Sequence, residues 1–328
     1  MTVDAVITWV NGNDQKHRLK REYYLNKNID TKASENISDT RFASNHEINY
    51  CVLSILKYAS WIDKIYIVTD NQTPLIFEDV SKFYPHRVKD IIMIDHIQIF
   101  PKEIDALPNF NSTSIESCLW RIPGLSDRFI YFNDDFFLLQ PMTVEDFFID
   151  QRPVLRGEKS LAPFLKIAFL KLKKRYWSTL RINKKNRYSF QVGQYRGAKL
   201  VQNGLSFWMH HHTPYPLNKN VLKKFYSEHK QVFLQNISFR FRDNSQFIIN
   251  ALVNNIEITQ YNNSNFSQKK LVYIKNISNQ NKLNHKIALL QNPKYLFACI
   301  QSIDQLPISF QNQLYSVLDI IIHPVKRN

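Results

Sequence analysis

The sequence predicts an α/β fold in which a mostly parallel sheet is flanked by helices. A β-branched stretch at 3–10 is followed by a polar segment, an amphipathic helix and a second apolar stretch at 64–68, which is the order of a βαβ unit. With 328 residues, 44% of them hydrophobic, the chain can bury a sizeable core. Glycine is scarce, at 6 residues, and no glycine-rich phosphate loop occurs.

The first hundred residues are expected to alternate strands and helices. Residues 15–40 are polar and charged, typical of a helix and a loop. Apolar residues then recur at helical spacing, and Ser44 or Asn45 is expected to cap that helix. A third strand is expected at 88–94, and a basic helical insertion and a helical C-terminal part complete the predicted fold.

The segment from Phe110 to Leu138 is expected to organise the molecule. It predicts a helix carrying Glu116, a turn at Pro123-Gly124 and a buried strand that delivers Asn133, Asp134 and Asp135. Two adjacent carboxylates at the end of a buried strand are costly without a cation or a reacting group. A simple turn is the alternative, but the apolar residues that follow at once favour a site.

Polar groups end all four predicted strands. They are Asn11-Gly12, Asp70, Asp95-His96 and Asn133-Asp134-Asp135. In a Rossmann-like sheet these ends meet at one edge, where ligands bind, so Asn11 and Gly12 are candidates for a nucleotide pocket. An ordinary Asn-Gly turn explains those two residues equally well.

The positive charge of the chain is concentrated in one segment. Residues 152–199 hold 14 Lys or Arg and a single acid, Glu158, and include a stretch typical of a basic amphipathic helix. Three partners suit it: an anionic membrane surface, an anionic substrate or nucleic acid. Because no nucleic-acid motif accompanies the charge, the first two are favoured and no nucleic-acid partner is expected. A solvated basic face is the remaining alternative.

Two later motifs carry nitrogen donors. Consecutive histidines at 210–212 cannot all bind one ion in an extended segment, so one functional histidine is expected. Arg240 and Arg242 are expected on one face of an extended segment, before a helix holding Gln246, where they suit phosphate. A surface salt bridge is the alternative for either arginine alone. In the tail from Tyr261 onward, helical segments are expected around 295–300 and 314–322, and no catalytic or binding motif is found.

The compartment is predicted from what the sequence lacks. Three widely spaced cysteines in apolar runs indicate buried reduced thiols, and neither a signal peptide nor an apolar span of about 18 residues occurs. A cytoplasmic protein, peripheral at the inner face of the membrane, is expected. The expected parts are 1–150 and 206–260 as the catalytic domain, 151–205 as the insertion and 261–328 as the C-terminal segment.

Four segments together resemble the Stealth family. They are DAVITWVNGND, RFASNHEINYCVLSILKYASWIDKIYIVTDNQTP, FNSTSIESCLWRIPGLSDRFIYFNDDFFL, and HTPYPLNKNVL with SFRFRDNSQF. That family includes bacterial capsular polysaccharide hexose-1-phosphate transferases. The resemblance implies a nucleotide-sugar donor, most often UDP-N-acetylglucosamine, a divalent ion (Mg²⁺ or Mn²⁺), a glycan or lipid-linked glycan acceptor, and release of UMP.

The resemblance also implies roles for single residues. The catalytic positions fall on Asp135, His212 and Arg240. The substrate-binding positions fall on Asn11, Gly12, Arg41, Asn45, Glu47, Glu116, Asn133, Asp134 and Arg181, and the arginine motif adds Arg242. The metal is expected at Asp134 and Asp135. Gln301-Ser302 and Gln246 depart from the family pattern, which often has Asn-Asp and Asp there.

Two other functions compete with sugar-1-phosphate transfer. A metal-dependent glycosyltransferase would use the same acid pair and release UDP. A non-catalytic protein that binds polyanions or membranes would need only the basic segment, but would leave the polar strand ends unexplained.

Overall fold

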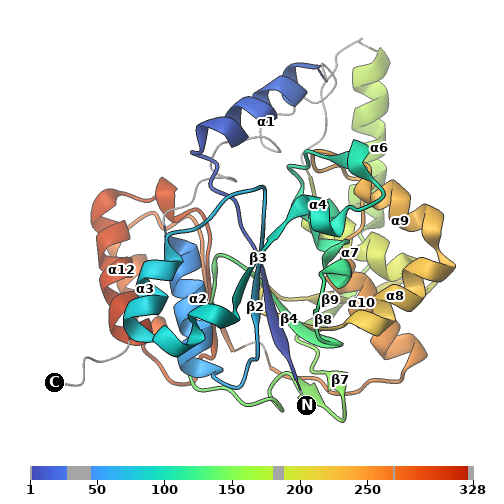
Figure 1. Ribbon diagram of the computed structural model, residues 1–328. Coiled ribbons are helices and arrows are strands. Elements are labelled where there is room, and N and C mark those ends of the chain that lie inside the picture. The colour runs from blue at the N-terminus through green and yellow to red at the C-terminus, as the bar shows by residue number, and fades with distance from the viewer. Residues whose placement is uncertain (1, 28–45, 180–187, 269, 324–328) are drawn as a thin grey trace.

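The centre of the molecule is a five-stranded sheet (Figure 1). Its strands are β1 Asp4–Thr8, β2 Ile65–Thr69, β3 Ile91–Asp95, β4 Arg128–Asn133 and β10 Tyr215–Asn218. The computed structural model describes residues 2–27, 46–179, 188–268 and 270–323. The strand order is β10-β4-β1-β2-β3; only β10 is antiparallel to its neighbour. The predicted α/β fold with a mostly parallel sheet is confirmed.

Helices lie on both sides of this sheet (Figure 1). One side holds α2 Glu47–Tyr58, α3 Ile76–Phe83 and α12 Ile308–Ile322, and the other holds α8 Lys219–Glu228, α9 Lys230–Ile237 and α10 Ile249–Gln260. Because both faces are covered, the middle of the inner strand β1 is apolar, and its residues Ala5, Val6 and Ile7 are fully buried.

Two predicted boundaries near the N-terminus are wrong. The N-cap of α2 is His46, which has φ 66° and makes no side-chain capping bond, whereas the expected caps Ser44 and Asn45 lie outside the described residues. The third strand begins at Ile91 and not at residue 88. Residues Pro85–Asp90 form a 3-10 helix instead, started by a proline whose fixed φ suits a first helical position.

The two aspartates lie where the chain leaves the central sheet. Asp134 and Asp135 form the turn between β4 and β5 Phe136–Leu138. β5 belongs to a second sheet, of order β11-β12-β5, with β11 Leu271–Ile274 and β12 Phe297–Ile300. The acids are therefore held between two sheets, and the apolar residues after them enter the second one.

The C-terminal part is mixed and not only helical. The predicted helix around 295–300 is wrong, because Phe297–Ile300 is β12 and pairs antiparallel with β5. β12 lies between β11 and β5, and the two ladders satisfy the backbone groups of these four residues. The predicted helix at 314–322 is confirmed as part of α12.

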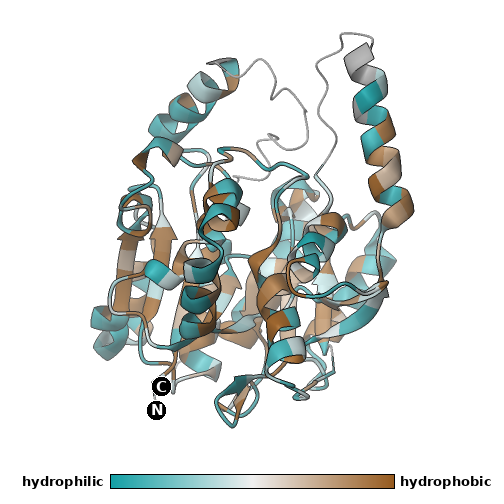
Figure 2. Ribbon diagram, turned by 90° about the vertical axis from the view of Figure 1, so that its right-hand side faces the viewer, coloured by the Kyte–Doolittle hydropathy of each residue, from teal (hydrophilic) through white to brown (hydrophobic). Residues whose placement is uncertain are grey.

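The basic segment combines helices with a strand pair. The expected basic helix is α6 Phe164–Thr179, and α7 Phe190–Lys199 follows it. β8 Gly157–Leu161 pairs antiparallel with β9 Ser206–His210 and ties the segment to the body. α6 and α1 Gln15–Lys27 both project from the same end of the molecule (Figures 1 and 2). In the part of the chain that the structure describes, no helix meets the length and hydropathy needed to cross a bilayer.

Short elements complete the chain. They are α4 His96–Ile99, α5 Ser112–Glu116, α11 Gln280–Leu290, β6 Phe148–Ile149, β7 Arg152–Pro153 and the 3-10 turns Ile104–Ala106, Leu119–Arg121 and Ile303–Gln305. Cys51, Cys118 and Cys299 are buried free thiols, as predicted. The division into four segments stays a prediction.

Candidate active site

A cavity of about 780 Å³ opens at the carboxyl edge of the central sheet. Thr8 and Trp9 reach it from the end of β1, His96 from the end of β3, and Asn133 from the end of β4. Loops from the second sheet and the turn before α7 close its other sides. The expectation that polar strand ends gather at one edge is confirmed for these strands.

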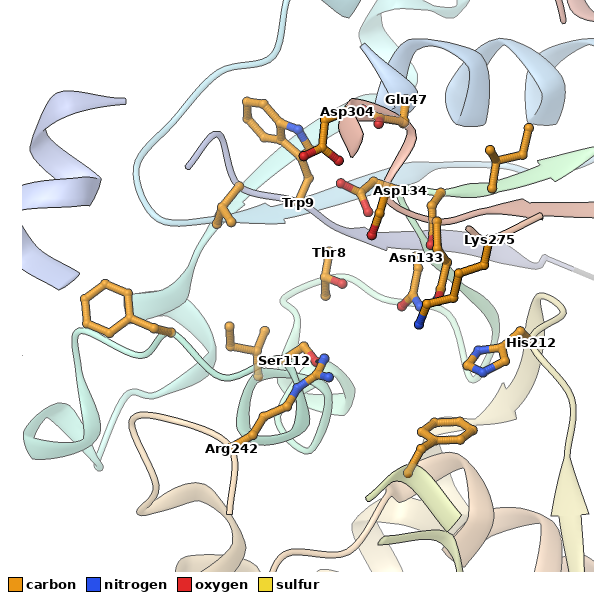
Figure 3. Close-up of a pocket in the computed structure, with 18 of the residues that line it drawn as sticks. Thr8, Trp9, Glu47, Ser112, Asn133, Asp134, His212, Arg242, Lys275 and Asp304 are labelled. Carbon is orange, nitrogen blue, oxygen red and sulfur yellow. Dashed lines mark hydrogen bonds between the residues drawn. The ribbon is translucent and has the colours of Figure 1, made fainter. Parts of the chain in front are cut away.

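Carboxylates form one wall of this cavity. Asp134 and Asp135 share it with Glu47, the first residue of α2 (Figure 3). Burial, together with the charge of Glu47, raises the pKa of Asp135 to about 7. Burial, Asp135 and Glu47 hold the pKa of Asp134 well above its usual range. The protein alone therefore does not compensate the charge of this pair.

The acidic wall fits a hard divalent cation. Asp135 Oδ1 is buried and has no hydrogen-bond partner within the described residues. Those residues contain no group of three or more His, Cys, Asp or Glu placed to hold a metal. Magnesium is commonly held by one or two carboxylates, with water and substrate phosphates completing its shell. Asp134 and Asp135 suit such an ion, shared with a phosphorylated ligand.

The raised pKa values predict how the stability of the metal-free protein depends on pH. A carboxyl group whose pKa rises from 3.8 to about 7 on folding favours the folded state only while protonated. That contribution is fully present below about pH 4 and is lost as the pH rises through about 7. The melting temperature in EDTA is expected to be lower at pH 8 than at pH 5, measured by scanning calorimetry.

Magnesium should reverse this loss. At pH 8, 10 mM Mg²⁺ binding with a Kd of about 1 mM would raise the melting temperature by about 2 °C. Sodium chloride of equal ionic strength is the control. An equal rise with the control salt would contradict a divalent site at the acid pair.

Nitrogen donors and aromatic rings form the facing walls. Figure 3 shows Arg242 and His212 across the cavity from Glu47 and Asp304, with Lys275 beside Asn133. The ring of His212 stacks between Phe190, at a centroid distance of 4.6 Å, and Tyr273, at 5.6 Å. The two stacks fix the plane of the imidazole and leave its edge for polar contacts.

The three histidines point to different places, as predicted. Only His212 lines the cavity. The ring of His210 packs edge-on against Tyr215, and burial lowers its pKa to about 3. His211 Nε2 lies 3.8 Å from Glu158 at the surface. The expectation of one cavity histidine and two neighbours holds geometrically, and the catalytic role of His212 stays a prediction.

The two arginines do not share a face, so that prediction is wrong. Residues 238–243 bend instead of extending, because Gln246 is buried against Asn111 and Asn236 and draws the chain inward. Gln246 also precedes α10, so the predicted helix does not hold it. Arg242 donates to Ser112 Oγ and lines the cavity.

Arg240 is directed away from the cavity. Its Nη2 donates to the backbone oxygens of Asp105, at 2.6 Å, and Leu107, at 2.8 Å. Its guanidinium group lies over the ring of Tyr24, 4.6 Å from the centroid. These contacts join α1 to the loop before α5. The catalytic role expected for Arg240 stays a prediction.

A matched pair of variants separates the two arginines. Arg242→Gln is expected to lower kcat/KM about 10²-fold, because it removes a cavity cation that can neutralise phosphate charge. Arg240→Gln is expected to lower the melting temperature and leave kcat/KM near wild type. Turnover and calorimetry on both proteins check this, and the reverse pattern would return the catalytic role to Arg240.

Asn133 is held by hydrogen bonds at the cavity. Its Oδ1 accepts from the Tyr131 hydroxyl at 2.7 Å, and Thr8 Oγ1 lies 2.9 Å from that hydroxyl. Glu116 lines an adjoining hollow, and burial raises its pKa to about 7.

Other predicted residues lie elsewhere. Asn11 exchanges backbone hydrogen bonds with the Gln72 side chain, at 2.8 and 3.0 Å, and neither it nor Gly12 lines the cavity. Asp70 pairs with Lys20 at 3.1 Å. Arg41, Asn45 and Arg181 lie outside the described residues.

The tail supplies cavity residues that the sequence analysis missed. Lys275 and Asn276 follow β11, and Gln301, Ser302 and Asp304 follow β12. β11 and β12 are parallel, so the rule that ligands gather at strand ends would have found them had these strands been predicted. The departure at Gln301-Ser302 therefore falls within the cavity wall.

Comparison with known proteins identifies the family. Two family models match: Stealth protein CR1, conserved region 1, over residues 1–29, and Stealth protein CR2, conserved region 2, over residues 41–155. The chain belongs to the Stealth family. The matched regions of this Stealth chain hold the acid pair, Glu47 and Glu116, whereas His212 and both arginines lie beyond them.

Several relatives have related names. Capsular polysaccharide phosphotransferase WcwK of Streptococcus pneumoniae is 29% identical over 262 residues, which are 74% of each chain. Capsular polysaccharide phosphotransferase LcbA of Aeromonas hydrophila is 30% identical over 74% of this chain and 62% of its own. Capsular polysaccharide phosphotransferase cps1A of Actinobacillus pleuropneumoniae is 39% identical over 162 residues, so this Stealth chain matches only 42% of that relative's length.

Among solved structures, the chain is similar to galactosyltransferase LgtC in complex with donor and acceptor sugar analogs. The TM-score is 0.44 and the identity 9%, over 98% of each chain. Mouse xyloside xylosyltransferase 1 gives a TM-score of 0.38 at 10% identity, over 91% of this chain and 97% of that one. Both TM-scores are below 0.5, so the fold assignment depends on the sheet described above.

Proposed function

We propose that this Stealth chain transfers a hexose-1-phosphate from a nucleotide sugar to a hydroxyl group of a growing capsule-type glycan. The names of its relatives support the reaction class. The observation that carries the proposal is the arrangement of the cavity, where Asp134 lies across one space from Arg242 and His212 (Figure 3) and Asp135 lines the same cavity. The donor that we propose is UDP-N-acetylglucosamine, and the nucleotide released is UMP.

The reaction exchanges one phosphorus–oxygen bond for another. The acceptor oxygen attacks the phosphorus next to the sugar, the bond from that phosphorus to the oxygen bridging to UMP breaks, and UMP leaves with the bond electrons. The acceptor proton passes to Asp135 or His212, which both line the cavity. Such transfers depend on alignment and on neutralising charge at the equatorial oxygens.

The cavity cations suit that neutralisation. Arg242 presents a planar guanidinium group that matches phosphate oxygens, and Lys275 adds a second positive charge. Asp134 and Asp135 would hold the divalent ion, which supplies charge stabilisation to the diphosphate when it is bound. The residues of this chain orient the two substrates and carry the proton.

The alternative is a metal-dependent glycosyltransferase, which would break the sugar–oxygen bond and release UDP. The acid pair suits both reactions. The two cations Arg242 and Lys275 and the imidazole of His212 around one cavity suit the transfer of a phosphate group better. A third candidate is a non-catalytic protein that binds polyanions or membranes.

Identification of the released nucleotide tests these candidates. The protein is incubated with Mg²⁺, a lipid-linked or capsule-type acceptor and a panel of UDP- and GDP-sugars, with Asp135→Asn as the blank. UMP, with phosphorus retained in the product, is expected. UDP would establish the glycosyltransferase, and the absence of turnover with every donor and acceptor would favour the binding protein.

A further inference from the structure

α6 carries an exposed apolar stripe along one face. Leu165, Phe169, Leu172 and Tyr176 are spaced by four, three and four residues, which places them on one side of an α-helix. Their exposed fractions are 88, 61, 66 and 62%. Large apolar side chains left this exposed in a continuous row mark a surface that binds something.

Basic residues flank the stripe on both sides. At about 100° per residue, Lys166 and Lys173 fall on one flank, and Lys171 and Arg175 on the other. All four are exposed, and α6 contains no acidic residue. An apolar face bordered by Lys and Arg is the arrangement of helices that lie in the interface of an anionic bilayer.

Within the described residues, α6 packs against the body at its beginning. The ring of Phe164 contacts Tyr195 of α7 at 5.8 Å, and Ile167 packs on the small apolar cluster of Tyr195, Ala198 and Phe207. Beyond this point the helix projects away from the sheets, at the end of the molecule from which α1 also projects (Figures 1 and 2). The described part of the body therefore leaves the stripe uncovered.

We propose that α6 binds an anionic membrane surface, with the stripe at the boundary between headgroups and acyl chains and the flanking cations on lipid phosphates. The charge and the apolar stripe of α6 favour a membrane over two other binding partners, a second copy of the chain and a polyanion. A second copy packed along the stripe would bring two acid-free basic helices together, and the like charges would repel. A polyanion such as nucleic acid would satisfy the cations but leave the apolar stripe in water.

Docking by α6 has a consequence for the cavity. α7 packs against the base of α6, and its first residue, Phe190, lines the cavity and stacks on His212. If the proposed function holds, a docked α6 would hold the cavity near a lipid-linked acceptor. A cytoplasmic leaflet offers the anionic lipids required, in line with the peripheral location expected from the sequence.

Co-sedimentation with vesicles tests the docking. The protein is expected to bind vesicles containing 30% phosphatidylglycerol and to bind pure phosphatidylcholine vesicles much more weakly. Lys171→Gln with Arg175→Gln should weaken the anionic binding by about 5-fold per charge. The triple change Leu165→Ser, Phe169→Ser and Leu172→Ser should abolish it.

A matched triple variant controls for the loss of exposed apolar side chains. Leu75→Ser, Ile308→Ser and Ile320→Ser alter residues that are 72, 75 and 71% exposed but lie off α6, and binding should persist. Equal loss in both triples, or equal binding to neutral vesicles, would overturn the proposal. A dimer in sedimentation velocity that only the α6 triple dissolves, without vesicle binding, would assign the stripe to a second copy. Vesicle co-sedimentation does not depend on turnover. A failure of the membrane proposal can therefore be distinguished from a failure of the proposed reaction.

Discussion

Asp135→Asn is expected to lower turnover by about 10²- to 10⁴-fold while raising the melting temperature of the metal-free protein at pH 8. The substitution removes a buried carboxyl group whose pKa is already raised to about 7, and asparagine keeps the size of the side chain. The folded state of the metal-free protein becomes more stable, whereas the group proposed to hold the cation or accept the proton is lost. Steady-state release of UMP and calorimetry in EDTA measure the two effects.

Asp127→Asn is the matched control. The side chain of Asp127 is 65% exposed and pairs with Lys219 at 3.5 Å, so its loss should change neither quantity much. Near-normal turnover in Asp135→Asn would remove this residue from the mechanism. Loss of turnover with a lower melting temperature would point to damaged folding and not to lost chemistry.

His212→Phe is expected to reduce turnover by about 10²- to 10⁴-fold with little loss of stability. Phenylalanine keeps an aromatic ring between Phe190 and Tyr273, so the stacked arrangement can persist while both ring nitrogens disappear. Turnover measured over pH 5–9 is the readout. His211→Phe is the neighbouring control, because His211 lies outside the cavity wall.

The pH profile also separates the two candidate bases. If Asp135 accepts the proton, the residual activity of His212→Phe should keep the shape of the wild-type profile. If His212 is the base, the ascending limb of the profile should change in this variant. Full activity in His212→Phe would leave the ring with a packing role only.

The acid turn could be predicted because its signal is local. An apolar strand, two carboxylates and a return to apolar residues occur within a dozen consecutive positions, and parallel strands must bring their carboxyl ends to one edge. The βαβ unit and the amphipathic spacing of α2 are local in the same sense. These patterns were sufficient to place His96, Asn133 and the acid pair at one edge of one sheet, whereas at the end of β1 the structure puts Thr8 and Trp9 in the cavity wall in place of the predicted Asn11 and Gly12.

The errors arose where distant contacts decided the conformation. The direction of Arg240 depends on backbone oxygens 135 and 133 positions away, at Asp105 and Leu107. The burial of Gln246 under Asn111 bends the chain and turns Arg242 alone into the cavity. No spacing rule within the motif SFRFRDNSQF contains either contact.

The sequence by itself determined the four parallel strands of the central sheet, the edge at which polar groups gather and the basic amphipathic character of α6, because each follows from local patterns along the chain, and its motifs identified the family. It did not predict β10, which completes the central sheet. Tertiary structure decided which side chains share the cavity. It brought Lys275 and Asp304, which follow strands of the second sheet, into the cavity that the acid pair lines. It also placed His212, and neither His210 nor His211, in the cavity wall. The physical reason is that strand pairing and buried hydrogen bonds between distant segments orient these side chains, and local propensity contains no information about either.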